Sequence, residues 1–192
     1  EKGIGLSRNS AFMRSSADII EFADDDMIFV KNYENIVIDE FKSHPEADAI
    51  LFNIESMNPD RPLLKISKFS RVNRIDALKY GCARLVIRRE AVLYNNLSFS
   101  LLFGGGAIYG SGEDTVFLQD AIRAGLKIYK SPVKIADVKQ DNSTWFHGYT
   151  DQYYIDKGAL FAQIFPSACY VYAFFTSLKN WSNFKEARKK YI

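Results

Sequence analysis

Short apolar runs alternate with segments of helical periodicity along most of the chain, and this alternation constrains the fold more than any other feature. The apolar runs have the length of buried strands and lie at 18–23, 47–54, 83–87, 127–130 and 133–138. The segments with helical spacing or helix-ending signals lie at 8–16, 33–43, 89–95 and 113–124. Strands that alternate with helices predict an α/β fold with helices on both faces of the sheet.

The composition narrows the class of protein. The 192 residues are 47% apolar, which is enough to bury a core. The net charge of +2 excludes a strongly basic nucleic-acid binder, so we expect no nucleic-acid partner. Cys82 and Cys169 are too few for a secreted scaffold held by disulfides, and this favours a reducing compartment such as the cytoplasm.

The charge is unevenly distributed at the C-terminal end. Residues 158–178 contain no charged side chain, and residues 179–192 hold five Lys or Arg against one Glu, a net charge of +4. Polar residues and Pro166 disfavour a membrane-spanning helix here. Two compatible interpretations remain: a helix pair broken at Pro166 and packed on the body, or an amphipathic segment on a membrane surface with its basic tail on anionic lipid. We therefore divide the chain into 1–150 and a helical segment at 151–192.

Three consecutive aspartates, Asp24, Asp25 and Asp26, directly follow the first apolar run. In open α/β sheets, ligands bind just beyond the carboxyl ends of strands. Adjacent carboxylates repel one another, and Mg²⁺ or Mn²⁺ often bridges such oxygens to substrate phosphates. In an extended loop Asp24 and Asp26 would project to one side and share a metal or a ribose. The alternative is a solvated turn or an N-cap for the helix at 33–43.

A glycine-rich loop at 96–112 leads into Glu113 and Asp114. No Lys followed by Ser or Thr comes after the glycines, which excludes a Walker-type phosphate loop. Acidic residues in the first turn of a helix are favoured by the helix dipole alone. They are also well placed for one of them to act as a general base at the edge of a cleft. The residues by themselves leave both interpretations open.

Taken together, these segments resemble the family 2 type of GT-A glycosyltransferases over residues 3–165. The segment 3–11 (GIGLSRNSA) is similar to the G…(S/A)RN.A element, 24–26 to the DxD motif, and 112–115 (GEDT) to the GED element. The run at 47–54 corresponds to the strand that follows DxD. The resemblance implies a GT-A-like mixed, mostly parallel sheet flanked by helices. It also implies that the chain lacks the first βαβ unit, and that its C-terminal helical aromatic segment follows the catalytic part.

The resemblance assigns roles to the acidic residues. Asp114 would be the catalytic base, and Asp24 and Asp26 would hold Mn²⁺ or Mg²⁺. If the motif is shifted by one residue, Ala23 stands where an aspartate is common, and Asp26 is a metal ligand in either register. His147 is a candidate additional metal ligand, although a histidine in such a place is more often simply a polar loop residue.

The remaining roles concern the two substrates. The residues expected at the donor are Arg8, Asn9 and Asp25, and those expected at the acceptor are Gly112, Glu113 and Trp145. Trp145 could stack on a sugar or fill the core.

The implied activity is an inverting transfer of sugar from a nucleotide-diphosphate donor to a hydroxyl of a carbohydrate or lipid-linked acceptor. Its expected setting is the synthesis of bacterial surface polysaccharide or glycolipid, in the cytoplasm at the inner face of the membrane. Because the first βαβ unit would hold the nucleotide base, we expect this chain alone to have little or no activity. The alternatives are a related nucleotidyltransferase and a non-catalytic membrane-associated adaptor.

Overall fold

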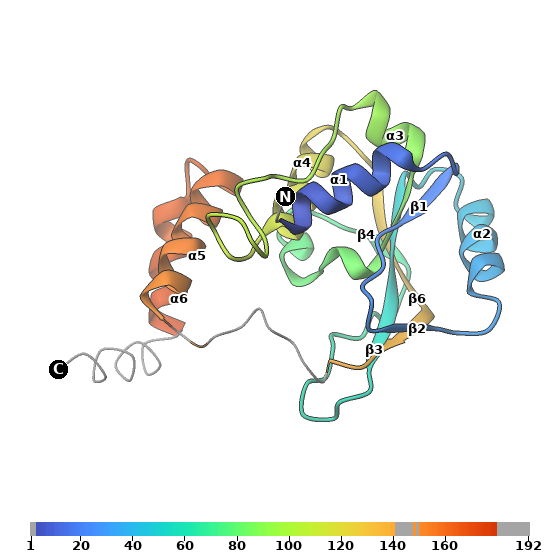
Figure 1. The fold of residues 1–192 in the computed structure, drawn as a ribbon, viewed down its shortest axis with the longest axis horizontal. Helices are drawn as coiled ribbons and strands as arrows, with labels where there is room; N and C mark the ends of the chain where they lie inside the picture. Colours follow the sequence, from blue (N-terminus) through green and yellow to red (C-terminus); the bar gives the residue numbers. More distant parts are fainter. Residues whose placement is uncertain (1–2, 141–147, 149, 180–192) are drawn as a thin grey trace.

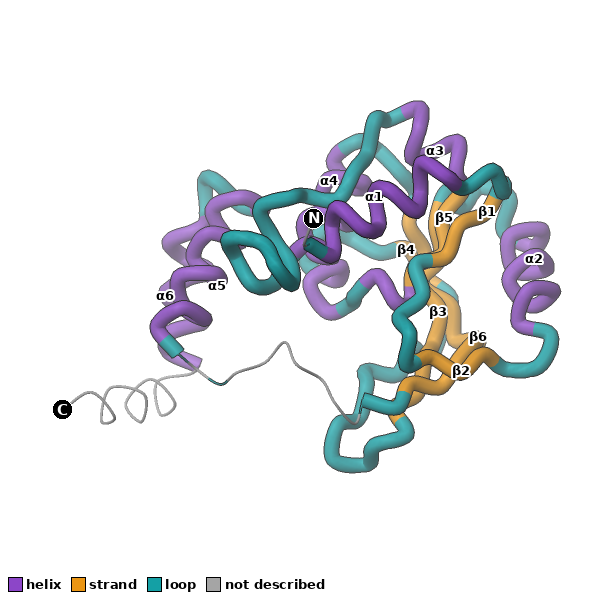
Figure 2. Tube along the Cα trace, in the orientation of Figure 1, coloured by secondary structure: helices purple, strands orange, loops and turns teal. Residues whose placement is uncertain are grey.

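The computed structural model of the chain describes residues 3–140, 148 and 150–179. Within them lies one six-stranded sheet (Figures 1 and 2). Its strands are β1 (Ile19–Glu21), β2 (Met27–Phe29), β3 (Ala49–Ser56), β4 (Ser70–Arg71), β5 (Leu85–Arg88) and β6 (Ile128–Val138). The order across the sheet is β1-β5-β3-β6-β2, and β4 pairs with β6. The long strands β3 and β6 therefore form its centre.

Helices cover both faces of this sheet, as expected for an α/β fold. The helices are α1 (Ile4–Arg14), α2 (Tyr33–Ser43), α3 (Arg89–Tyr94), α4 (Glu113–Arg123), α5 (Asp151–Ile164) and α6 (Cys169–Lys179). Two short 3₁₀ turns, η1 (Asp76–Lys79) and η2 (Cys82–Arg84), precede β5. Figure 1 shows α2 on one side of the sheet and α1, α3 and α4 on the other.

The strand β3 shows why the two faces are both covered. Its side chains alternate, as they must in a strand. Leu51 packs in the cluster that contains Phe117 of α4, whereas Ile50 and Phe52 pack in the cluster that contains Phe41 of α2. All three β3 side chains are fully buried, so both faces of the sheet are core.

The expectation of a mostly parallel sheet is wrong. Among the described strands only β3 and β6 run parallel, and the pairs β1·β5, β3·β5, β2·β6 and β4·β6 are antiparallel. A parallel neighbour requires a crossover connection, usually a helix. The segment from β3 to β5 contains only β4, η1 and η2, so the chain returns in the opposite direction.

The strands expected at 127–130 and 133–138 form one strand, β6. It continues through Pro132, which is exposed, at an irregularity in its pairing with β3. Asn53 of β3 stabilises this point: its amide nitrogen donates to the carbonyls of Pro132 and Ile66, both at 2.9 Å, and its oxygen accepts from the Ile66 N–H at 2.8 Å. A buried side-chain amide thus satisfies backbone groups beside the irregularity in the sheet.

The C-terminal helices pack against α4 through a third apolar cluster. Leu160 and Ile164 of α5 meet Val116 of α4 there. The guanidinium groups of Arg74 and Arg123 both donate to the carbonyl of Ile164 at the end of α5, where backbone acceptors are otherwise free. The expected helix pair broken near Pro166 is therefore confirmed. In the described part of the chain, no helix has both the length and the apolar character needed to span a bilayer.

Candidate functional site

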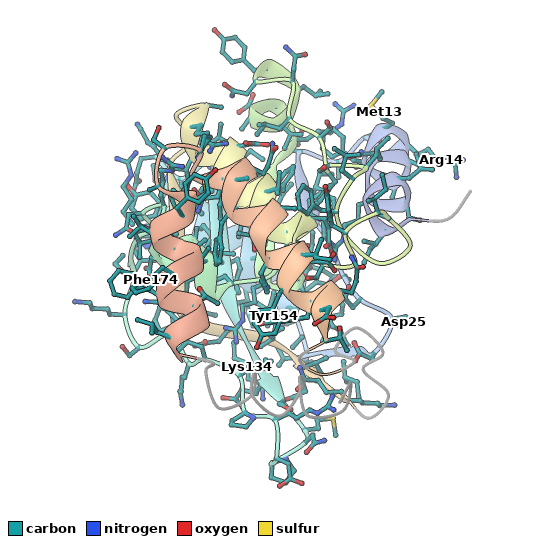
Figure 3. All side chains as sticks on the ribbon, turned by 90° about the vertical axis from the view of Figure 1, so that its left-hand side faces the viewer. Met13, Arg14, Asp25, Lys134, Tyr154 and Phe174 are labelled. Carbon is teal, nitrogen blue, oxygen red and sulfur yellow. The ribbon has the colours of Figure 1, made fainter. Side chains whose placement is uncertain are left out.

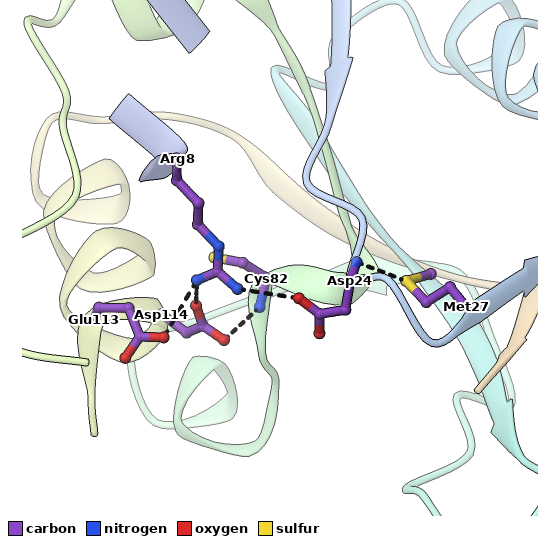
Figure 4. Close-up of polar contacts among 6 residues, drawn as sticks. All are labelled: Arg8, Asp24, Met27, Cys82, Glu113 and Asp114. Carbon is purple, nitrogen blue, oxygen red and sulfur yellow. Dashed lines mark hydrogen bonds and ion pairs between the residues drawn. The ribbon is translucent and has the colours of Figure 1, made fainter. Parts of the chain in front are cut away.

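One arginine of α1 gathers three carboxylates from two distant parts of the chain (Figure 4). The Arg8 guanidinium contacts Asp114 through Nη1, lies 3.3 Å from Oε1 of Glu113, and places Nη2 3.5 Å from Oδ1 of Asp24. The Arg8 side chain is only 11% exposed. Asp24 follows β1, whereas Glu113 and Asp114 begin α4. The acids of the two motifs therefore meet around a single cation.

The carboxylate of Asp114 is held from both sides. Arg8 contacts Oδ1, and the backbone N–H of Cys82 donates to Oδ2 at 2.9 Å. A Cβ on Gly81 would lie 3.0 Å from that same oxygen, so a glycine there leaves room for the close approach. Gly112 caps the start of α4 with a φ of 116°, a conformation that favours glycine. These contacts fix the direction in which the Asp114 carboxylate points.

The helix α1 is positioned on the loop that precedes α4. A Cβ on Gly5 would lie 2.4 Å from the carbonyl oxygen of Ser100, so backbone and helix touch directly. The Asn9 amide accepts from the Phe99 N–H at 2.8 Å and donates to the Phe99 carbonyl at 2.9 Å. The Phe99 ring also lies under the Arg8 guanidinium, 5.2 Å from its centroid. Asn9 thus positions Arg8 indirectly.

The glycine-rich loop closes over Glu113. Gly104 has a φ of 105°, and a Cβ there would lie 2.9 Å from the Glu113 carboxyl group. Further along, the N–H of Gly110 donates to Oδ2 of Asp156 on α5 at 3.0 Å. Asp156 is buried and also accepts from Gln152 at 2.7 Å. The loop therefore lies against the start of α4 at Gly104 and is hydrogen-bonded to α5 at Gly110.

The site carries more negative than positive charge. Burial raises the pKa of Asp24; Arg8 opposes this, and the nearby carboxylates of Asp114 and Asp26 add to it. Burial also raises the pKa of Glu113, and Asp114 adds to that shift. For Arg8, burial acts to lower the pKa, but the carboxylates, Asp114 foremost, outweigh it and the pKa is raised. One guanidinium therefore does not balance this group of acids.

The excess of negative charge suits a divalent cation at Asp24 and Asp26. Asp24 remains about half exposed, and Oδ2 of Asp26 accepts a hydrogen bond from the N–H of Gln140 at 3.3 Å. In the described residues, no group of three or more His, Cys, Asp or Glu side chains could hold a metal by itself. Mg²⁺ is commonly held by one or two carboxylates, with phosphate and water oxygens completing its shell. The donor set fits such a cation, which stays a prediction.

The sequence-predicted residues fall into three groups. Arg8, Asp24, Glu113 and Asp114 come together, with Gly112 adjacent to them. Asn9 faces the Phe99 backbone, Asp26 accepts from the Gln140 N–H, and Asp25 is exposed to solvent (Figure 3). Trp145 and His147 lie outside the described residues.

The sequence reasoning missed two supports of this site. The Cys82 N–H is a backbone group, which every residue type except proline supplies, so no sequence pattern could have identified it. Asp156 stands just before the uncharged run at 158–178. The position of this acidic residue at the edge of an uncharged run was the signal in the sequence that could have identified it.

The structure is similar to solved structures of S. aureus TarS. TarS 1-349 matches 84% of this chain and 44% of its own length, with 16% identity and a TM-score of 0.63. TarS 1-349 in complex with UDP-GlcNAc matches 84% of this chain and 46% of its own, with 16% identity and a TM-score of 0.65. The sequence itself matches no family model and no curated protein. The chain spans less than half the length of these TarS structures, and the likeness shows that it has a GT-A-like fold.

Proposed function

We propose that this chain is the metal- and acceptor-binding part of an inverting glycosyltransferase that uses a nucleotide-diphosphate sugar. The observation that carries the proposal is the meeting of Asp114 and Asp24 around Arg8, which brings the GED-like and DxD-like segments to one place. Support comes from the shared fold with TarS, which has been solved in complex with UDP-GlcNAc and with UDP.

Asp114 is the proposed base. As the acceptor hydroxyl attacks the anomeric carbon, Asp114 takes its proton while the bond from that carbon to the diphosphate oxygen breaks. Attack from the face opposite the leaving group inverts the anomeric configuration. Arg8 and the Cys82 N–H hold the Asp114 carboxylate in one orientation, which supports this role.

Asp24 and Asp26 are the proposed ligands of Mn²⁺ or Mg²⁺. When bound, the cation would neutralise the negative charge that develops on the diphosphate leaving group. Arg8, Asn9 and Asp25 are assigned to the donor side. Gly112, Glu113 and the glycine-rich loop are assigned to the acceptor side.

The proposed acceptor is a carbohydrate or a lipid-linked sugar in the synthesis of a surface polysaccharide or glycolipid. The proposed location is the cytoplasm, at the inner face of the membrane. The uncharged aromatic segment and the basic residues that follow it support this location.

The chemistry is tested by Asp114→Asn in the longer enzyme that we expect to contain this chain. Asparagine can still accept from the Cys82 N–H, and Arg8 keeps its contacts with Glu113 and Asp24, but the amide cannot take a proton. We expect the rate of sugar transfer, measured as the release of nucleoside diphosphate, to fall by at least about 100-fold. Binding of UDP with Mn²⁺ should be largely unchanged.

The matched control is Asp120→Asn. Asp120 lies on the same helix and forms an exposed ion pair with Arg123 at 3.0 Å. This variant should transfer sugar at the normal rate. Normal transfer by Asp114→Asn would refute the assignment of the base, and release of pyrophosphate in place of nucleoside diphosphate would favour a nucleotidyltransferase.

A further inference from the structure

The helix α6 has one face that packs on the body and one that does not. On the inner face, Tyr172 stacks on Phe165 with ring centroids 4.5 Å apart and lies 5.9 Å from Phe161. The outer face carries the exposed side chains Tyr170, Val171, Phe174, Phe175 and Leu178. Figure 3 looks onto the α5–α6 pair and shows Phe174 at its outer edge.

This outer face is continuous and apolar. Its residues follow one another at one- and three-residue steps, which places them on a single side of an α-helix. Tyr170 is 87% exposed, and Phe174 and Phe175 are 60% and 63% exposed. A helix that is apolar all round is normally buried on all sides. Contiguous exposed apolar surface of this kind marks an interaction site.

We propose that the outer face of α6 binds the surface of a membrane that contains anionic lipid. The charged residues that follow α6 in the sequence indicate which partner it binds. Residues 179–192 begin at the last residue of α6 and have a net charge of +4. Aromatic and aliphatic side chains combined with Lys and Arg bind the boundary between headgroups and acyl chains, and anionic headgroups attract the basic residues.

The charge on the rest of the molecule favours attachment through the α6 end. The remaining residues carry a net charge of −2, so an anionic surface attracts the α6 end and weakly repels the body. Two copies of this chain would each bring a segment of +4, and like charges oppose association. The charge pattern thus favours lipid over a second copy.

The proposal is tested by flotation of the full chain with vesicles. One set contains phosphatidylcholine alone, and the other also contains phosphatidylglycerol. We expect binding to the anionic vesicles, and about tenfold or more weaker binding for Phe174→Gln/Phe175→Gln. Lys189→Gln/Lys190→Gln should also lose at least about tenfold, because each basic residue near an anionic surface contributes to binding.

The matched control is Tyr94→Gln on α3. Tyr94 is 90% exposed, and Figure 1 places α3 at the far end of the molecule from α6. This variant removes an exposed aromatic of similar size and should bind vesicles as the wild type does. All the substituted aromatic side chains are exposed, so the variants should fold, which circular dichroism checks.

The proposal would be overturned if the wild type did not float with vesicles, or if it bound both vesicle types equally. Normal binding by Phe174→Gln/Phe175→Gln would overturn it as well. A concentration-dependent dimer that this double variant abolishes, without vesicle binding, would assign the face to a second copy. The proposal rests on the location part of the proposed function and not on its chemistry. Binding of UDP with Mn²⁺ should be the same in the α6 variants and the wild type, so the two can fail separately.

Discussion

Removal of the Arg8 charge should destabilise the fold in a manner that depends on pH. The substitution is Arg8→Met, which keeps most of the length of the side chain and removes the cation. In the wild type this guanidinium contacts Asp114, Glu113 and Asp24 and lies over the Phe99 ring. The variant leaves the carboxylates together without it.

The expected size follows from burial. Removal of one partner from a buried ion pair costs about 3–5 kcal/mol, because the other charge stays buried and unpaired. The Glu113 and Asp114 side chains are mostly buried, whereas Asp24 is about half exposed and its ion pair contributes little. We therefore expect the free energy of unfolding to fall by about 3 kcal/mol near neutral pH. That is a large share of the stability of an ordinary domain.

Acid should reduce this loss. The pKa values of Asp24 and Glu113 are already raised in the fold, and Arg8 is an influence that lowers both. Without Arg8 they rise further, so the folded protein binds protons that the unfolded chain releases. A carboxyl with a raised pKa in the fold destabilises progressively as pH rises from its unfolded value through its folded value. The deficit of the variant should therefore be full at about pH 8 and much smaller at about pH 5.

Urea unfolding followed by circular dichroism at the two pH values measures this. The matched control is Arg14→Met, because Arg14 lies on the same helix and is exposed, pointing into solvent in Figure 3. The control should stay within about 0.5 kcal/mol of the wild type at both pH values. Equal stability of the two variants at pH 8 would refute the reasoning, as would a deficit for Arg8→Met that acid does not reduce.

Three further predictions concern stability. Burial raises the pKa of Glu21 to about 7, and in the described structure its Oε1 is buried without a hydrogen-bond partner, so wild-type stability should fall between about pH 4.5 and 7. Glu21→Gln should remove this fall, and its free energy of unfolding at pH 8 should exceed that of the wild type by about 2 kcal/mol. Gly5→Ala should destabilise by about 2 kcal/mol or more in chemical unfolding, because its Cβ would lie 2.4 Å from the Ser100 carbonyl oxygen. Asn53→Ala should cost about 3 kcal/mol by the same measurement, because it leaves buried backbone groups unpaired.

Each of these has a result that would contradict it. A Glu21→Gln profile parallel to that of the wild type across the pH range would exclude Glu21 as the titrating group. Gly158→Ala in α5 meets nothing within 4 Å and should instead stabilise by about 0.5–1 kcal/mol. If both glycine variants shift in the same direction, the contact with Ser100 is not the cause. For Asn53→Ala, a loss under about 1 kcal/mol would show that other groups satisfy the backbone.

The periodicity of the sequence predicted where helices form, but it did not predict the direction of the strands. The helix expected at 33–43 is α2, because its apolar positions recur at helical spacing and His44-Pro45 ends it. Strand β2 at Met27–Phe29 was missed, since three residues beside a run of charges give too short an alternation to detect. The direction of β5 depends on a connection without a crossover helix. Only tertiary structure reveals that.

The prediction of the candidate site rested more on the family resemblance than on local sequence patterns. Asp24 and Asp114 are 90 residues apart in the sequence, and composition gives no reason to bring them together. The sequence did not predict that Arg8 lies between these acids. Nor did it predict that the Asn9 amide pairs with the Phe99 backbone. Pairing between polar groups of this kind is decided by packing that one-dimensional patterns do not encode.

The contact between Arg8 and Asp114 joins residues separated by 106 positions. Closing so long a stretch of chain is entropically costly, and the pair cannot form until the sheet and α4 are in place. The charged cluster should therefore be absent from the folding transition state. Substitutions in it should accelerate unfolding and leave the folding rate nearly unchanged. The proposed catalytic site would then be assembled last, and the sugar transfer proposed for the longer enzyme would report on the completion of folding.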